Sequence, residues 1–141
     1  MKSKIDITLS TLHIGTCQRV VTLGLNGRDY AQDFLQKLHK DDYRKWRSIY
    51  ARITSVANYD SYENQITFRH IEDGLFEFKR GGLRLYAFYH SLHDQSQLIL
   101  CTNGGNKNTR KQQNSDIQRA QFIKQQFMDA ILEPQTNITI R

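Results

Sequence analysis

The stretch from Leu75 to His90, LFEFKRGGLRLYAFYH, contains two apolar runs joined at Gly81-Gly82. Two such runs with a glycine turn between them predict a pair of antiparallel strands, at 75–80 and 83–90. A third apolar run at 96–102 follows the short turn sequence LHDQS. The sequence therefore predicts a three-stranded antiparallel meander over residues 75–102, and this meander decides the predicted fold.

The rest of the chain predicts strands before the meander and helices on either side of it. Residues 1–24 contain two short strand-like runs, and the sequence Asn26-Gly27-Arg28 then favours a turn. Over residues 29–57 the apolar residues recur every three or four positions, which predicts two helices, or one helix kinked near residues 40–42. Trp46 is one of these recurring apolar residues, and we expect its side chain in the core. A last helix is predicted at 114–132, with a capping box at Ser115 and Gln118.

These elements predict one domain over residues 1–141. We expect an α+β fold in which a small antiparallel sheet, the meander plus the N-terminal strand or strands, carries two N-terminal helices and a C-terminal helix on one face. The chain has 141 residues, which suits a single core, and 38% of them are hydrophobic. The tail, 135–141, is expected as a final strand or a frayed end.

Composition excludes several classes of function. The two cysteines, Cys17 and Cys101, are far apart in sequence, so neither a disulfide framework nor a zinc site is expected. The phosphate-loop, dinucleotide-binding and metalloprotease motifs are missing from the sequence, and no metal or cofactor is predicted. No apolar run has the length of a membrane helix or a signal-peptide core, so we expect a cytoplasmic protein without a membrane partner.

The net charge of +6 is located in one part of the chain. Between Lys79 and Gln125 there are eight cations against Asp94 and Asp116, whereas the other twelve cations and twelve acids cancel. A basic segment of this kind favours a polyanionic partner, although an ordinary solvated surface is the alternative.

The strand at 83–90 predicts two different faces, because alternate side chains point to opposite sides of a sheet. Leu83, Leu85, Ala87 and Tyr89 form an aliphatic side that suits packing on helices. The other side carries Arg84, Tyr86, Phe88 and His90, a mixture of cations and rings that suits phosphate binding and base stacking.

Each of these residues also has a simpler interpretation. Arg84 pairs with Glu77 across the hairpin in one alternative, and Lys79 and Arg80 are edge charges that prevent strand aggregation in another. In the simpler interpretation of His90, this residue is exposed near a turn and has no catalytic role. The loop that follows the third strand gives a stronger signal, because Lys107, Arg110 and Lys111 precede a helix whose N-terminal amides favour anions. No acidic residue lies between Lys107 and Asp116.

Residues 73–125 resemble the toxins of the RelE/ParE superfamily, in particular their HigB-like and phage-derived branch. Gly74-Leu75-Phe76-Glu77-Phe78-Lys79 fits that branch's first strand, and Arg84 with Tyr86 or Phe88 fits the second. The basic segment and helix start are matched in register by Lys107, Thr109, Lys111, Asp116, Ile117 and Ala120. The sequence departs from the pattern at Asn108 and Gln113, which replace a lysine and a proline, and the loop phenylalanine is missing.

The resemblance implies a ribosome-dependent mRNA endonuclease that an antitoxin protein holds inactive. The partners it implies are the cognate antitoxin, the ribosome and mRNA. In this assignment Arg84 binds the scissile phosphate, with Lys79 and Lys107 beside it, and Glu77 or His90 carries a proton. The RNA backbone is contacted by Arg80, Arg110 and Lys111, and Tyr86 and Phe88 stack on bases.

Two alternatives stay open because a cluster of arginine and lysine is poorly suited to proton transfer near neutral pH. One is a gyrase-directed toxin of the same superfamily, which acts by binding and needs no nuclease site. The other is an inactive RNA-binding or antitoxin-binding relic.

Overall fold

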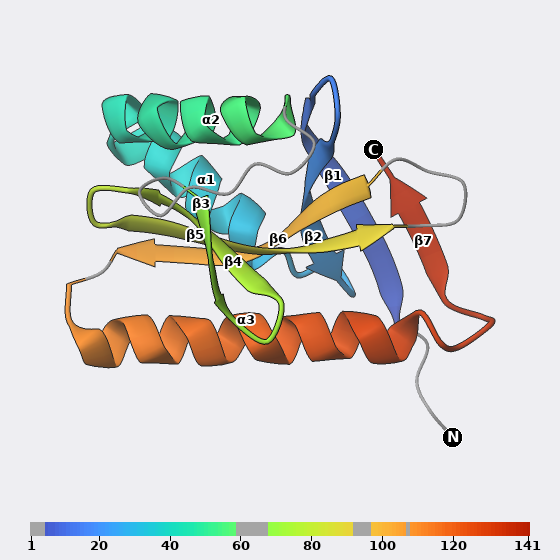
Figure 1. The fold of residues 1–141 in the computed structure, drawn as a ribbon. Helices are drawn as coiled ribbons and strands as arrows, with labels where there is room; N and C mark the ends of the chain where they lie inside the picture. The colour runs from blue at the N-terminus through green and yellow to red at the C-terminus, as the bar shows by residue number, and fades with distance from the viewer. Residues whose placement is uncertain (1–4, 59–67, 92–96, 107) are drawn as a thin grey trace.

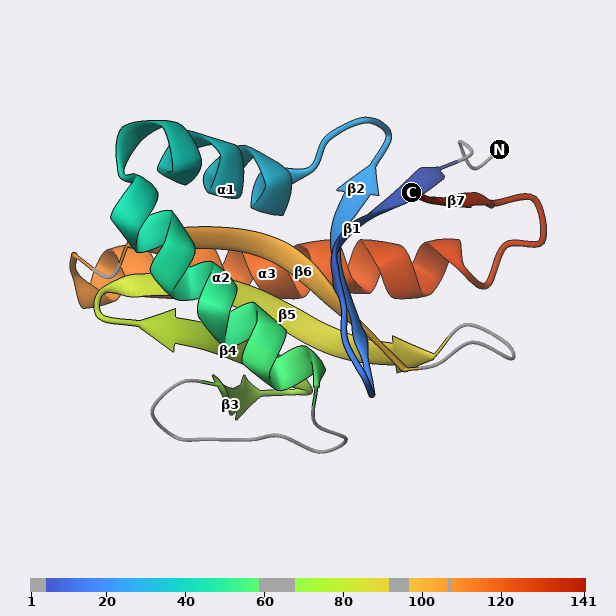
Figure 2. The same cartoon turned by 90° about the horizontal axis from the view of Figure 1, so that it is seen from above.

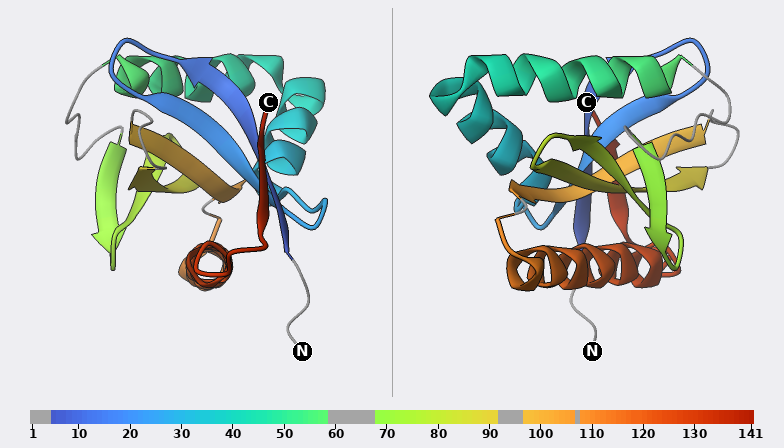
Figure 3. Two further views of the ribbon diagram at one scale, coloured as in Figure 1. Left: turned by 90° about the vertical axis from the view of Figure 1, so that its right-hand side faces the viewer. Right: turned by 60° about the vertical axis from the view of Figure 1, so that its left-hand side comes forward.

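The computed structural model describes residues 5–58, 68–91, 97–106 and 108–141. One sheet lies between two helices on one face and a long helix on the other, as Figures 1 and 3 show. In chain order the elements are β1 (Asp6–Ile14), β2 (Arg19–Leu25), α1 (Tyr30–Asp41), α2 (Tyr43–Ala57), β3 (Phe68–Glu72), β4 (Leu75–Arg80), β5 (Leu83–Ser91), β6 (Gln97–Asn106), α3 (Arg110–Ala130) and β7 (Asn137–Ile140).

The sheet has seven strands in the order β3-β4-β5-β6-β2-β1-β7. The pairs β2·β6 and β1·β7 are parallel, and the other neighbours are antiparallel. The predicted fold, a small antiparallel sheet with all helices on one face, is therefore wrong. The sheet is mixed and larger, and α3 covers the face opposite to α1 and α2. The strands that pair in parallel are far apart in sequence, so no local turn sequence predicts that they pair.

Aspartates and a threonine set where the helices begin. The Asp29 side chain accepts a hydrogen bond from the Gln32 amide at the start of α1, and Asp42 both ends α1 and caps α2. Helix α3 begins at Arg110, before the predicted 114, because Thr109 accepts from the Gln112 amide. The predicted capping box at Ser115 thus lies inside the helix.

Strand β5 is packed on both faces. Its Leu83, Leu85 and Ala87 side chains join the core beneath α1 and α2, which confirms the predicted aliphatic side. Its Phe88 side chain joins a second core beneath α3. In Figure 2, viewed from above, α2 crosses β4 and β5 while α1 runs along β6.

Trp46 lies at the margin of the first core and is only partly buried there. Its ring stacks between those of Tyr43 and Tyr50, with centroid distances of 5.6 and 5.1 Å. The residue expected in the core is thus the middle of an aromatic stack along α2.

Candidate functional site

Polar and charged residues of β3 to β6 lie in two rows on the sheet face that α3 covers. Residues paired directly across neighbouring strands share a face. The first row crosses four strands in register, and the second crosses three. We call the two rows together the polar cluster: Arg69, Glu77, Tyr86 and Asn103 in the first, and Lys79, Arg84 and Gly105 in the second.

A buried carboxylate between two arginines forms the centre of the polar cluster. The Arg69 Nε lies 2.8 Å from Glu77 Oε1, and the Arg84 Nε lies 3.5 Å from Glu77 Oε2. The Glu77 side chain is fully buried, and that of Arg84 is 4% exposed. The alternative in which Arg84 pairs with Glu77 across the hairpin is thus the arrangement found.

Arg84 also holds the hairpin turn. Its NH1 group donates to the backbone oxygens of Gly81, at 2.6 Å, and Leu83, at 2.8 Å. With these partners and this burial, the guanidinium faces protein on all sides. Arg84 therefore positions the turn in this structure and does not present its charge to a phosphate.

The aromatic residues of β5 are also covered. Tyr86 packs on Ala120 of α3, and Phe88 lies 5.6 Å from Phe127 between ring centroids. Both side chains are about 1% exposed. The interpretation of this face as an open surface of cations and rings is therefore wrong, because α3 closes it and leaves neither ring free to stack on a base. Burial, with smaller contributions from Glu77 and Asp116, raises the pKa of Tyr86 and keeps its phenol neutral.

Asp116 is the carboxylate that the sequence interpretation missed. It was expected only as a favourable residue at a helix start, but its side chain lies over Gly105, in contact with the position that a Cβ atom would take. The Asn103 amide donates to the Asp116 backbone oxygen at 3.0 Å, and the Gln112 amide donates to its carboxylate at 3.1 Å. Partial burial raises the pKa of Asp116. The Gly104-Gly105 pair before a helix is the signal that points to this close approach.

Exposed cations surround the outer end of the polar cluster. Leu83 pairs with Asn106, so the β4–β5 turn lies beside the start of α3 at one end of the molecule (Figure 1). Arg80, Arg110 and Lys111 are exposed there, and Lys79, half-buried, is opposite Arg84. We call these four residues the cationic end. Lys107 lies outside the described residues.

Arg80 also ties this end to the helical layer above it. Its Nε donates to the Ser48 hydroxyl of α2 at 2.6 Å. The contact fixes the direction of an otherwise mobile side chain at the strand end, which lowers the entropy lost when the guanidinium meets an anion.

His90 belongs to a different part of the sheet. It is six residues from Arg84 on the same strand, a separation of about 20 Å. Its ring meets that of Phe127 edge-on at 5.1 Å, and burial lowers its pKa. The structure therefore does not bring His90 together with the other predicted catalytic residues.

Comparison with known protein families, with curated proteins and with solved structures finds no match for this chain. Among the described residues no group of three or more His, Cys, Asp or Glu side chains is arranged to hold a metal ion. None of the described helices is long and apolar enough to cross a membrane.

Proposed function

We propose that this protein is the toxin of a toxin-antitoxin system, a HigB-like member of the RelE/ParE superfamily. In this proposal it acts in the cytoplasm as a ribosome-dependent mRNA endonuclease, and a cognate antitoxin neutralises it. The support is that the segments carrying the resemblance form one continuous piece of structure, since β4, β5, β6 and the start of α3 lie side by side.

The cationic end is the observation that carries the proposal. Arg80 ends β4, whereas Arg110 and Lys111 begin α3, and all three residues are exposed. The β4–β5 turn and the start of α3 lie at the same end of the molecule (Figure 1). Glu77 is buried and Asp116 is half-buried, and partial burial raises the pKa of Asp116. Such a surface suits the sugar-phosphate backbone of RNA, with the antitoxin supplying acidic groups that compete for it.

Asp116 replaces Glu77 and His90 as the proton acceptor in this proposal. The RNA 2′-hydroxyl attacks the adjacent phosphorus and gives its proton to the Asp116 carboxylate. The bond to the 5′-oxygen breaks, that oxygen takes a proton from water, and a 2′,3′-cyclic phosphate remains. A raised pKa suits this task, because general bases work best near the operating pH. The ribosome supplies the orientation of the strand.

The first test measures RNA binding at the cationic end. Titration of a labelled single-stranded RNA at several salt concentrations gives a slope that counts the phosphate contacts. Arg110→Ala should weaken binding and reduce the slope by about one contact. Arg141→Ala, which removes an equal charge at the opposite end of the molecule, is the matched control (Figure 1). Equal weakening by both variants contradicts the proposed surface.

The second test measures cleavage in cells. Expression without a neighbouring antitoxin gene should arrest growth and leave transcripts cut inside reading frames. Asp116→Asn keeps the size of the side chain and removes the base, so transcripts should remain intact while the protein stays folded by circular dichroism. Undiminished cutting by Asp116→Asn excludes the assigned base.

A toxin that binds without cutting is the second candidate. The inward orientation of Arg84, paired with Glu77, favours it, because the arginine best placed for a reacting phosphate is occupied. Growth arrest with damaged DNA and intact transcripts supports this gyrase-directed alternative. Normal growth in every host tested supports an inactive relic of the family.

A further inference from the structure

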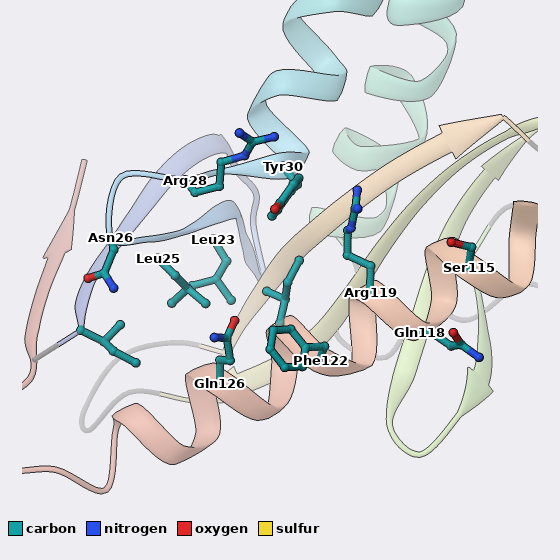
Figure 4. Close-up of a pocket in the computed structure, with 12 residues that line it drawn as sticks. Leu23, Leu25, Asn26, Arg28, Tyr30, Ser115, Gln118, Arg119, Phe122 and Gln126 are labelled. Carbon is teal, nitrogen blue, oxygen red and sulfur yellow. The ribbon is translucent and has the colours of Figure 1, made fainter. Parts of the chain in front are cut away.

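A groove of about 570 Å³ lies on the α3 side of the sheet, and none of its lining residues belongs to the polar cluster (Figure 4). One wall is α3, and the other is the segment that leads from β2 into α1. The apolar part of the lining comprises Ile5, Leu23, Leu25, Phe122 and Ile123. Phe122 is 63% exposed, so the described residues leave a large part of its ring uncovered at the groove.

Two arginines converge on one tyrosine at the groove. The Arg28 guanidinium carbon lies 4.4 Å from the centre of the Tyr30 ring, and that of Arg119 lies 4.7 Å from it. Figure 4 shows that the two side chains come from opposite walls. The Tyr30 ring lies between the two guanidinium groups and attracts both cations, while the N–H edges of each guanidinium remain able to bind an anion.

The charges around the arginines leave the groove basic. Arg28 has Asp33 at 3.7 Å, but both side chains are more than 60% exposed, so this ion pair is weak and readily exchanged. None of the described residues that line the groove is Asp or Glu. The polar residues of the lining, besides the arginines and Tyr30, are neutral: Asn26, Ser115, Gln118 and Gln126.

We propose that this groove binds a nucleotide, with the phosphate on the N–H edge of Arg119 and the base against Phe122. Arginines provide forked donors for phosphate, and an exposed aromatic ring provides a stacking surface for a base. Carboxamides both donate and accept, which suits the edges of bases. The volume lies within the range of small-ligand sites. The groove shares no lining residue with the cationic end, and the proposal does not rest on the proposed function.

Calorimetric titration tests the proposal with the four ribonucleoside 5′-monophosphates, the corresponding nucleosides and inorganic phosphate. At least one monophosphate should bind about tenfold or more tightly than its nucleoside and than phosphate alone, because both halves of the ligand are recognised. Equal binding of phosphate and monophosphates overturns the proposal, since it reduces the groove to a nonspecific anion site. Binding of none of the probes also overturns it.

Variants locate the binding in the groove. Arg119→Ala and Phe122→Ala should each weaken monophosphate binding by about tenfold or more. Arg44→Ala removes an exposed arginine on α2, across the sheet, and Met128→Ala removes an exposed apolar side chain of α3 outside the groove. Neither control should change the binding. Equal effects of Arg44→Ala and Arg119→Ala contradict the assigned site.

Competition then identifies the source of the nucleotide. A 5′-phosphorylated RNA trinucleotide that displaces the monophosphate at lower concentration indicates the end of an RNA strand, and weaker displacement indicates a free nucleotide. Both results keep the proposed site. Displacement by a short polyglutamate peptide at lower concentration than by either nucleotide ligand overturns the proposal in favour of an acidic protein partner.

Discussion

At the scale of single residues, Glu77 shows how a buried charge organises the meander. Its carboxylate forms ion pairs with Arg69 and Arg84, and among the described residues neither the Glu77 Oε2 nor the Arg84 Nε has a hydrogen-bond partner. Burying both charges costs desolvation free energy, and their mutual attraction offsets this cost only while both partners are present. The three side chains therefore stabilise the structure as a unit.

Glu77→Gln should lower the free energy of unfolding by about 3–5 kcal/mol, because it leaves the Arg84 charge buried without a counter-charge. Urea denaturation measures the loss. Glu72→Gln, at an exposed position on the neighbouring strand, should change stability by less than about 0.5 kcal/mol.

A double variant separates the loss of charge from the loss of packing. Glu77→Met combined with Arg84→Met removes both charges, so it should recover a large part of the stability lost by Glu77→Gln. A double variant that is less stable than the single one would contradict the account of Glu77 as a counter-charge.

His90 gives stability a dependence on pH. Burial against Phe127 lowers its pKa in the folded state below the usual value of about 6.5. The unfolded chain then binds more protons in this range, so this contribution to stability is present above pH 6.5 or so and is lost as the pH falls through the folded-state pKa. Urea midpoints between about pH 7.5 and about pH 5 should fall less in His90→Gln than in the wild type. Identical slopes would exclude the assignment.

At the scale of elements, the distance between α1 and β6 depends on one glycine. The Phe34 ring of α1 lies directly on Gly104, where a Cβ atom would overlap it. Without a side chain at this position the helix reaches the strand closely, and the layer packs without a gap.

Gly104→Ala should destabilise the protein by about 1–3 kcal/mol, because the Phe34 ring must move out of a packed layer. Gly82→Ala is the matched control, since its added methyl meets open space and should change stability by less than about 0.5 kcal/mol. Thermal unfolding compares the two. In a Phe34→Leu background the effect of Gly104→Ala should shrink, and an unchanged effect would show that Phe34 is not the cause.

The elements also show how far the sequence could be interpreted. Glycine turns and alternation located β4, β5 and the aliphatic face, and helical periodicity located α1 and α2, because these signals are local. The parallel pairing of β2 with β6 and the covering of Tyr86 and Phe88 by α3 depend on contacts between distant segments. For the same reason Arg84 and Glu77 could be given a functional and a structural interpretation, and Asp116 was visible only as a helix-start residue.

At the scale of the whole molecule, the centre of the sheet joins the two halves of the chain. Cys101 of β6 pairs with Thr22 of β2 on one side and with Ala87 of β5 on the other. It is fully buried, and burial raises the pKa of its thiol, so the reactive thiolate is scarce in the folded protein.

In a Cys17→Ser variant, Cys101 should therefore react with a thiol reagent only when the whole molecule unfolds. The free energy of opening obtained from the labelling rate should equal the free energy of unfolding from urea denaturation, within about 1 kcal/mol. In the wild type the half-buried Cys17 should react first. Fast labelling of Cys101 under native conditions would show that β6 separates from its neighbours locally.

The pairing of β1 with β7 has a consequence for synthesis. Ile7 lies beside Ile138, and Leu9 beside Ile140, so β1 completes its hydrogen bonds only after β7 has been synthesised. Strand β2 likewise pairs with β6 only after β6 has been synthesised. Contacts between such distant segments form slowly, and a growing chain folds only what has emerged. The newly made N-terminal hairpin thus keeps an open edge on each side until β6 and β7 have left the ribosome.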